Sequence, residues 1–196
     1  MDTSKLQKFD LSFPGHWIAG ANRKWAFDTA LILRHIENSF IEAVAAFSLF
    51  RPITKENIET FLAEWQSRSR YEGCLNGLYA KAFVYSLDAI EKLLSRLCRD
   101  LSAPASVKLL HQEYQQKFGH LKHIRDSAIH IEDRGRGINR RQSPIETNLL
   151  VLGSFIGNRF TFTGEDGKMY EIKISETPLI CAHQILQGVI NAYIWE

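Results

Sequence analysis

The segment from Lys117 to Arg141 has residue types that could do chemistry on phosphates. It carries seven lysine or arginine residues against three acidic ones, whereas the whole chain has a formal net charge of only +2. It also contains three of the seven histidines, His120, His123 and His130. Basic charge beside imidazoles, whose ordinary pKa lies near neutrality, is typical of sites that bind or act on phosphates. The same pattern is also compatible with a solvated, arginine-rich loop beside a helix end.

A short motif inside this segment carries the clearest signal. Arg125 and Asp126 precede His130 in the run Arg-Asp-Ser-Ala-Ile-His, near the end of an expected long helix. The motif, with the helical bundle expected before it, resembles the HEPN superfamily of helical nucleases and nucleotide-binding proteins. The signature of that family is an arginine, a polar residue and a later histidine, set late in a helix of a four- or five-helix bundle. The resemblance covers about residues 18–133.

The resemblance implies metal-independent cleavage of RNA, with no cofactor, by a homodimer whose two motifs face one cleft. In such a reaction the 2′-hydroxyl attacks the adjacent phosphate, and His130 would act as general base or acid. Arg125 would hold the scissile phosphate and neutralise the charge that develops on it. Asp126, one helical turn before His130, would orient the imidazole. Family members often serve in bacterial toxin–antitoxin or phage-defence systems, which implies an antitoxin or another protein as a further partner.

The segment after the motif, residues 134–144, reads RGRGINRRQSP. Its two glycines, its proline and its four arginines predict an exposed loop. We expect the arginines to follow the phosphates of an RNA backbone. These candidate RNA-binding residues are Arg134, Arg136, Arg140 and Arg141.

The spacing of the motif sets a geometric condition. On a straight helix Arg125 and His130 lie about 140° apart, with Arg125 near the apolar stripe. They meet at one phosphate only if the long arginine reaches round, the helix distorts near its end, or a second subunit supplies one of them. His123, Asp126 and His130 also share one face at a spacing that can present metal ligands. No fourth ligand is evident, so we expect no metal site.

Helical periodicity predicts the elements that position the motif. Apolar residues recur at three- and four-residue spacing in four segments, which indicates four helices. The last of these segments contains Gly119, which loosens a helix in its middle. The four segments cover about residues 18–50, 54–65, 75–101 and 104–133.

Residues 147–175 have a β-type pattern instead. Three short stretches alternate apolar and polar residues, and the run from Gly164 to Gly167 is typical of a hairpin turn. A closing helix is expected over residues 177–195. The predicted fold is therefore mainly α: an antiparallel helical bundle, a small C-terminal antiparallel β-meander and a closing helix, in a single domain of residues 1–196.

The composition limits the class of protein. A chain of 196 residues with 45% hydrophobic and 23% charged residues fits one globular domain, and a net charge of +2 excludes a polycation. Cys74, Cys98 and Cys181 are too far apart for a metal-ligand pair, so we expect reduced thiols. No secretory signal or bilayer-spanning stretch is evident, so we expect a cytoplasmic protein without membrane association. The alternative function is a non-catalytic helical module for protein interaction or dimerisation.

Overall fold

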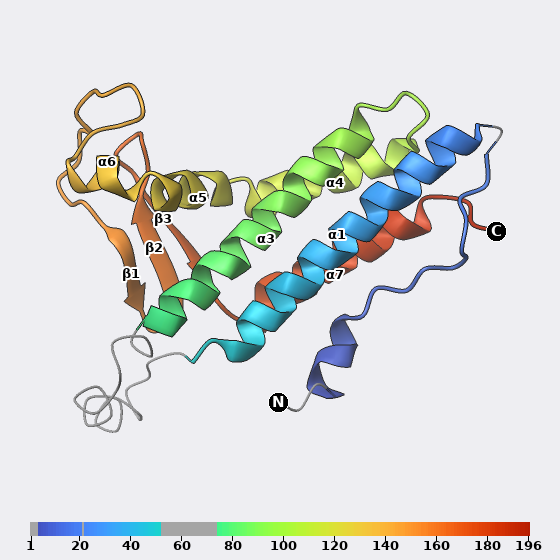
Figure 1. The fold of residues 1–196 in the computed structure, drawn as a ribbon, viewed down its shortest axis with the longest axis horizontal. Helices are drawn as coiled ribbons and strands as arrows, with labels where there is room; N and C mark the ends of the chain where they lie inside the picture. Colours follow the sequence, from blue (N-terminus) through green and yellow to red (C-terminus); the bar gives the residue numbers. More distant parts are fainter. Residues whose placement is uncertain (1–3, 21, 52–73) are drawn as a thin grey trace. The chain divides into compact units, whose positions relative to one another are not determined.

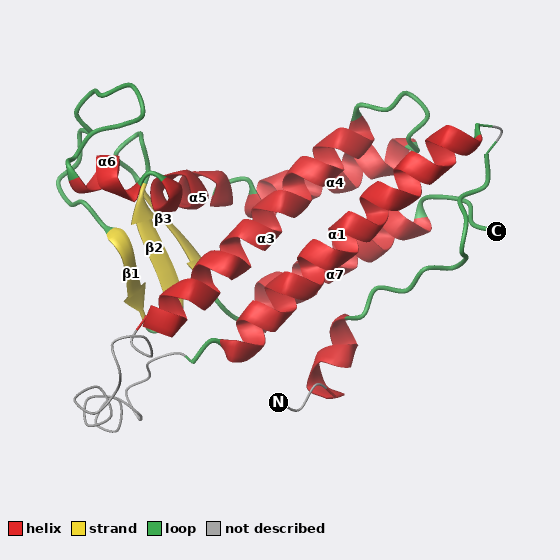
Figure 2. Cartoon of the chain, viewed as in Figure 1, coloured by secondary structure: helices red, strands yellow, loops and turns green. Residues whose placement is uncertain are grey.

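The computed structural model describes residues 4–20, 22–51 and 74–196. Within them the chain forms six α-helices, a short 3-10 helix and one three-stranded antiparallel sheet (Figures 1 and 2). The predicted fold class is confirmed: it is mainly helical, with a β-meander near the C-terminus and a closing helix after it. The elements are η1 (Ser4–Phe9), α1 (Arg23–Leu49), α3 (Leu75–Cys98), α4 (Ala105–Phe118), α5 (Leu121–Ile129), α6 (Ile131–Gly135), β1 (Leu152–Ile156), β2 (Arg159–Thr163), β3 (Met169–Lys173) and α7 (Glu176–Asn191).

The chain divides into two compact units. The helical unit comprises the described residues within Met1–Val44, Ser86–Gly119 and Glu176–Glu196. The mixed unit comprises those within Ala45–Tyr85 and His120–Ser175, and α1 and α3 supply residues to both units. None of the helices in the described part of the chain is long and apolar enough to cross a membrane.

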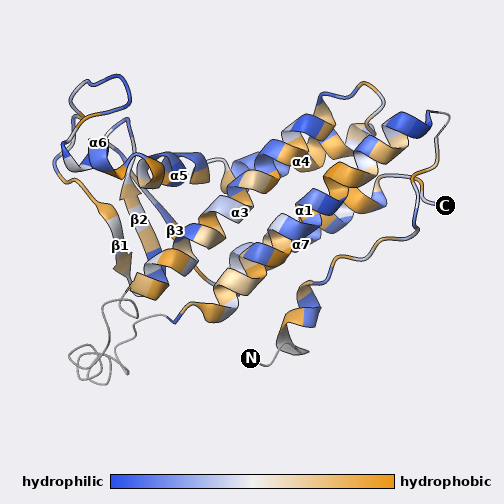
Figure 3. Cartoon of the chain, in the orientation of Figure 1, coloured by the Kyte–Doolittle hydropathy of each residue, from blue (hydrophilic) through white to orange (hydrophobic). Residues whose placement is uncertain are grey.

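In the helical unit, parts of α1 and α3 lie with α4 and α7 in alternating directions (Figure 1). Each helix turns an apolar stripe inward, as the spacing of its apolar residues predicts (Figure 3). The Tyr114 hydroxyl of α4 donates to the Leu87 carbonyl of α3 at 2.9 Å. The rings of Phe40 in α1 and His183 in α7 lie 6.0 Å apart. The wholly or nearly buried core includes Leu33, Ile36, Phe40, Leu87, Ile90, Leu94, Val107, Tyr114, Leu179, Leu186 and Val189.

The first helix begins at Arg23 rather than near residue 18. Ile18 instead forms an isolated antiparallel bridge with Trp195. Asn22 then ends the extended stretch, because its side-chain oxygen accepts a hydrogen bond from the Trp25 N–H at 3.1 Å and so caps the helix. The helix predicted over residues 54–65 lies outside the described residues.

The prediction of a single helix over residues 104–133 is wrong, since three helices occupy this stretch. The first break is at Gly119, whose N–H donates to the Gln115 carbonyl at 2.8 Å. A Cβ at Gly119 would lie 2.6 Å from that carbonyl oxygen, so glycine suits this tight helix end. The second break is at His130, whose φ of −101° and ψ of 42° lie outside the α-helical region. The motif therefore occupies a short helix and its C-terminal cap.

The sheet of the mixed unit is a meander in the order β1-β2-β3. Its hairpin turn is confirmed at Gly164–Gly167, where the Gly164 N–H donates to the Lys168 carbonyl at 2.8 Å. Phe160 and Phe162 of β2 are buried, and α5 contacts both β2 and β3. An isolated two-stranded hairpin is marginal in water, so the third strand and the packing of α5 against the sheet both stabilise the meander.

Candidate functional site

Helix α5 places the predicted motif against the sheet of the mixed unit. Its apolar face buries Leu121, Ile124 and Ala128, and the helix contacts β2 and β3. Arg125 and Asp126 follow at the edge of this face, and their side chains are only 15% and 14% exposed. The motif therefore begins as a largely covered charged pair.

Arg125 and Asp126 form an ion pair between chain neighbours. Nε and Nη2 of Arg125 both donate to Oδ1 of Asp126, at 2.9 and 2.5 Å. Burial raises the pKa of the Tyr85 hydroxyl, and the positive charge of Arg125 opposes that shift. The carboxylate expected to orient the His130 imidazole is thus engaged by Arg125. The bond that does join Asp126 to His130 is between backbones: the His130 N–H donates to the Asp126 carbonyl at 3.1 Å.

Glu165, in the turn between β2 and β3, is a site residue that sequence reasoning missed. Arg140 donates two side-chain hydrogen bonds to the Glu165 carboxylate: Nε donates to Oε1 at 2.7 Å and Nη2 to Oε2 at 3.3 Å. Nη2 of Arg134 lies 3.1 Å from Oε1 of the same carboxylate. The hydrogen bonds from Arg140, with Arg134 beside them, hold the pKa of Glu165 down to about 2. The sequence around Glu165 predicts only a turn, so no local signal could have revealed this role.

Arg140 joins the two carboxylates into one cluster. Its Nη1 lies 4.0 Å from Oδ2 of Asp126, while its other nitrogens hold Glu165. The Arg140 side chain is 50% exposed, and hydrogen bonding to Glu165 raises its pKa. A distance of 4.0 Å is longer than a hydrogen bond, so Nη1 can also donate to an incoming anion. We call Arg125, Asp126, Arg134, Arg140 and Glu165 the arginine–carboxylate cluster; its formal charge is positive by one unit.

Arg134 differs from the exposed arginine that the sequence predicts. It lies in α6, and its side chain is 0% exposed. Nη1 donates to the Ile138 carbonyl at 2.8 Å, and Nε faces the Ser127 hydroxyl at 3.5 Å. Ser127 in turn donates to the Thr163 carbonyl at 2.9 Å. Arg134 therefore ties α5, α6 and the sheet together from the inside, where it is not open to an RNA backbone.

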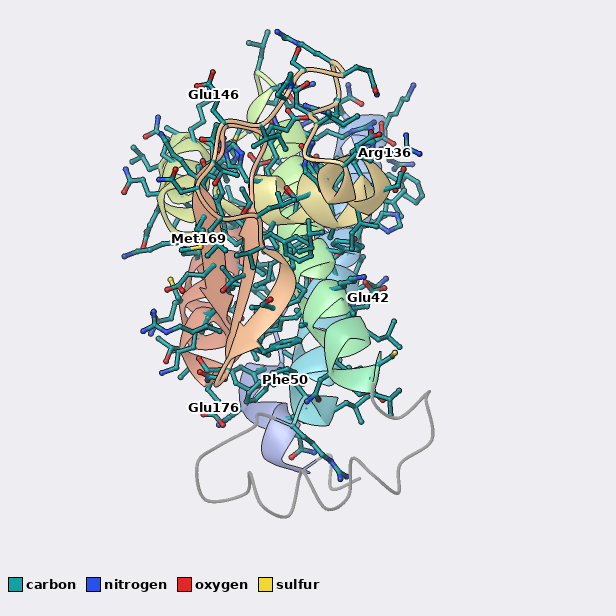
Figure 4. All side chains as sticks on the ribbon, turned by 90° about the vertical axis from the view of Figure 1, so that its left-hand side faces the viewer. Glu42, Phe50, Arg136, Glu146, Met169 and Glu176 are labelled. Atoms are coloured by element: carbon teal, nitrogen blue, oxygen red, sulfur yellow. The ribbon has the colours of Figure 1, made fainter. Side chains whose placement is uncertain are left out.

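The other loop arginines are exposed, as predicted. Arg136 and Arg141 both face solvent, and Figure 4 shows Arg136 at the surface of this unit. An isolated bridge between Ile138 and Pro144 closes the loop. Within it, Oδ1 of Asn139 accepts a hydrogen bond from the Arg141 N–H at 2.8 Å. The loop presents its cations on an ordered turn.

His130 is half-buried and stands between α5 and α6. A ring nitrogen of His130 and carboxylate oxygens of Glu132 and Asp133 all lie within 4.8 Å of one another. The other histidine of the expected polar face, His123, stacks on Tyr170 with ring centroids 4.2 Å apart. The two histidines of the metal-ligand face considered in the sequence therefore contact different neighbours: His123 contacts Tyr170, and His130 lies near Glu132 and Asp133.

Helix α5 ends at His130, whose N–H still donates to the Asp126 carbonyl, and the break redirects the chain that follows. Arg125, Asp126 and Arg140 come together, and His130 adjoins them through the backbone of Asp126. Comparisons with protein-family models, with curated proteins and with solved structures find no match to this chain.

Proposed function

We propose that this chain is a HEPN-like, metal-independent endoribonuclease or RNA-binding protein that acts through Arg125, Asp126 and His130. The observation that best supports this is the arginine–carboxylate cluster, in which Arg125, Asp126 and Arg140 come together just before the helix ends at His130. The separation of about 140° applies only to a straight helix. His130 still donates its N–H to the Asp126 carbonyl as in a helix, so the long arginine reaches round to the imidazole or a second subunit supplies one of the two residues. The arginine–carboxylate cluster, which contains Arg125, lies next to this helix end.

The proposed reaction divides the chemistry between His130 and Arg125. His130 accepts the proton of the RNA 2′-hydroxyl, and the 2′ oxygen forms a bond to phosphorus. The bond from phosphorus to the 5′ oxygen breaks, the 5′ oxygen takes a proton from water, and a 2′,3′-cyclic phosphate remains; His130 then returns its proton to the solvent. Arg125 stabilises the charge on the phosphate oxygens during this step. Asp126 orients the Arg125 guanidinium, as their two hydrogen bonds indicate.

Exposed arginines supply the rest of the proposed RNA surface. Arg136 and Arg141 are exposed, and Arg140 has one nitrogen that is not committed to Glu165. Such cations contact the RNA backbone without reading its sequence. Arg134 is left out of this surface because it is buried.

The proposed active form is a homodimer. The family resemblance supports it, because its catalytic members place two motifs across one cleft. It also supports a role in a bacterial toxin–antitoxin or phage-defence system, with an antitoxin as partner. Light scattering over a concentration series should give about twice the chain mass of 22.5 kDa. A mass that stays at the monomer value would contradict the dimer.

The decisive test is cleavage of labelled single-stranded and structured RNA by the purified chain in EDTA. Wild type should cleave, and His130→Ala and His130→Gln should not. His35→Ala is the matched control, because His35 is an exposed histidine of α1 outside the motif, and it should cleave like wild type. Circular dichroism should show that all variants keep their helical content.

Three outcomes would overturn the enzyme. Equal cleavage by wild type and both His130 variants would place the activity elsewhere or in a contaminant. RNA binding without cleavage would leave only the RNA-binding half of the proposal. The absence of both RNA binding and cleavage would favour the alternative, a helical module for protein interaction.

A further inference from the structure

His130, Glu132 and Asp133 form a cluster that depends on the break between α5 and α6. In a continuous helix, residues two apart do not face each other, so His130 and Glu132 would point to different sides. The φ and ψ of His130 interrupt the helix, and α6 starts at the next residue. As a result one imidazole nitrogen and two carboxylate oxygens lie within 4.8 Å of one another.

We propose that this cluster is a binding site for a divalent transition-metal ion, best suited to Zn²⁺. Zinc takes imidazole nitrogen and carboxylate oxygen together, and three protein ligands leave a fourth position for water. Two carboxylates and a neutral imidazole carry two negative charges, which match the charge of the ion. Magnesium and calcium prefer sites made of oxygen alone, so the histidine selects against them.

The imidazole distinguishes this cluster from an ordinary helix start. Glu132 and Asp133 lie in the first turn of α6, where the helix dipole favours carboxylates in any case. That effect does not account for a histidine that brings a ring nitrogen against both of them.

The basic residues nearby leave the two carboxylates available. Arg134, the next residue, is turned into the interior and held by Glu165 and the Ile138 carbonyl. Among the described residues, no salt bridge joins Glu132 or Asp133 to a basic side chain. Both can therefore close around an ion without first breaking an ion pair.

Zinc at this site has a consequence that rests on the function proposed above. A metal bound to the His130 nitrogen occupies the lone pair that would accept the proton of the 2′-hydroxyl. Zinc therefore inhibits cleavage, and EDTA restores it. The binding itself does not depend on any activity toward RNA.

Calorimetric titration of the metal-free full chain with Zn²⁺, without RNA, tests the site. Wild type should bind one ion per chain, and Mg²⁺ should bind far more weakly. Glu132→Gln and Asp133→Asn keep the shape of the side chains and should each weaken zinc binding at least about tenfold, since even residues that only support ligands cost 10- to 100-fold. His130→Ala should do the same. The controls His35→Ala and Glu146→Gln, which change exposed groups outside the cluster, should match wild type.

Nuclear magnetic resonance identifies the ligand independently of affinity. One equivalent of Zn²⁺ should shift the ring nitrogens of His130 and leave those of His35 unchanged. Equal zinc affinity in wild type and in the Glu132 and Asp133 variants would overturn the site, as would the lack of a one-ion stoichiometry in wild type. Zinc binding without cleavage in EDTA would overturn only the nuclease, and cleavage without zinc binding only the metal site.

Discussion

Nη2 of Arg134 lies 3.1 Å from Oε1 of Glu165, and the arginine of this pair is wholly buried. Within the described part of the chain Nη2 makes no hydrogen bond of good geometry, and the two groups attract as an ion pair. A buried charge is costly unless partners compensate it. Glu165 and the Ile138 carbonyl provide that compensation, and they connect α6 to the turn between β2 and β3.

Replacing Arg134 should therefore destabilise the mixed unit. Arg134→Met fills similar space but leaves Glu165 and the Ile138 carbonyl without their buried partner. We expect the free energy of unfolding to fall by about 2–3 kcal/mol, somewhat less than for a fully buried pair because Glu165 is partly exposed. Urea unfolding followed by circular dichroism measures this change. Arg136→Met, on the exposed side, should change it by less than about 0.5 kcal/mol. Similar losses in both variants would show that the buried pair has no special role.

Glu165 should make the free energy of unfolding depend on pH in the acidic range. Its pKa is about 2 in the folded protein, below the ordinary value of 4.5. A carboxyl group with a lowered folded pKa stabilises the fold above its unfolded pKa and loses that contribution as the pH falls. We expect the free energy of unfolding to fall between pH 4.5 and pH 2. In Glu165→Gln this fall should be smaller by about 1 kcal/mol, after allowance for solvent screening. An unchanged pH profile in the variant would contradict the assigned pKa.

Two glycines with positive φ should respond differently to alanine. Gly167 has a φ of 75°, and a Cβ there would overlap the Glu146 carbonyl oxygen. Gly157 has a φ of 62° but open space where its Cβ would lie. Gly157→Ala should cost only the backbone strain of about 1–2 kcal/mol. Gly167→Ala should cost about 1 kcal/mol more, because the hairpin must also shift. Thermal unfolding compares the pair, and equal losses would mean that the hairpin has room at Gly167.

The exposed arginines should contribute to RNA binding through charge. Arg136→Ala and Arg141→Ala should each weaken binding of a single-stranded RNA and lower the slope of log affinity against log salt concentration by about 1. Lys108→Ala is the control, since Lys108 is an exposed cation on α4 of the helical unit. Fluorescence anisotropy at several salt concentrations gives the slopes. Slopes that match wild type in the arginine variants would remove this loop from the RNA surface.

The structure agrees with only part of what the sequence predicted for the motif from Arg125 to His130. The run from Arg125 to His130 was predicted to lie late in one long helix over residues 104–133, whereas α5 ends at Ile129. The expected pairing of the Asp126 carboxylate with the His130 imidazole assumed an unbroken helix. The carboxylate accepts two hydrogen bonds from Arg125, its chain neighbour. The roles of these residues toward RNA stay predictions.

The sequence by itself determined the mainly helical class, the β-meander, the turn at Gly164–Gly167 and the exposure of Arg136 and Arg141. These features depend on periodicity and turn chemistry within a few residues, which a single chain displays directly. Only the tertiary structure decided that Arg134 is buried and that Glu165 holds it and Arg140. It also decided that His130 meets Glu132 and Asp133. Such relationships depend on packing between segments distant in the chain and on where a helix breaks, and neither is set by local propensity.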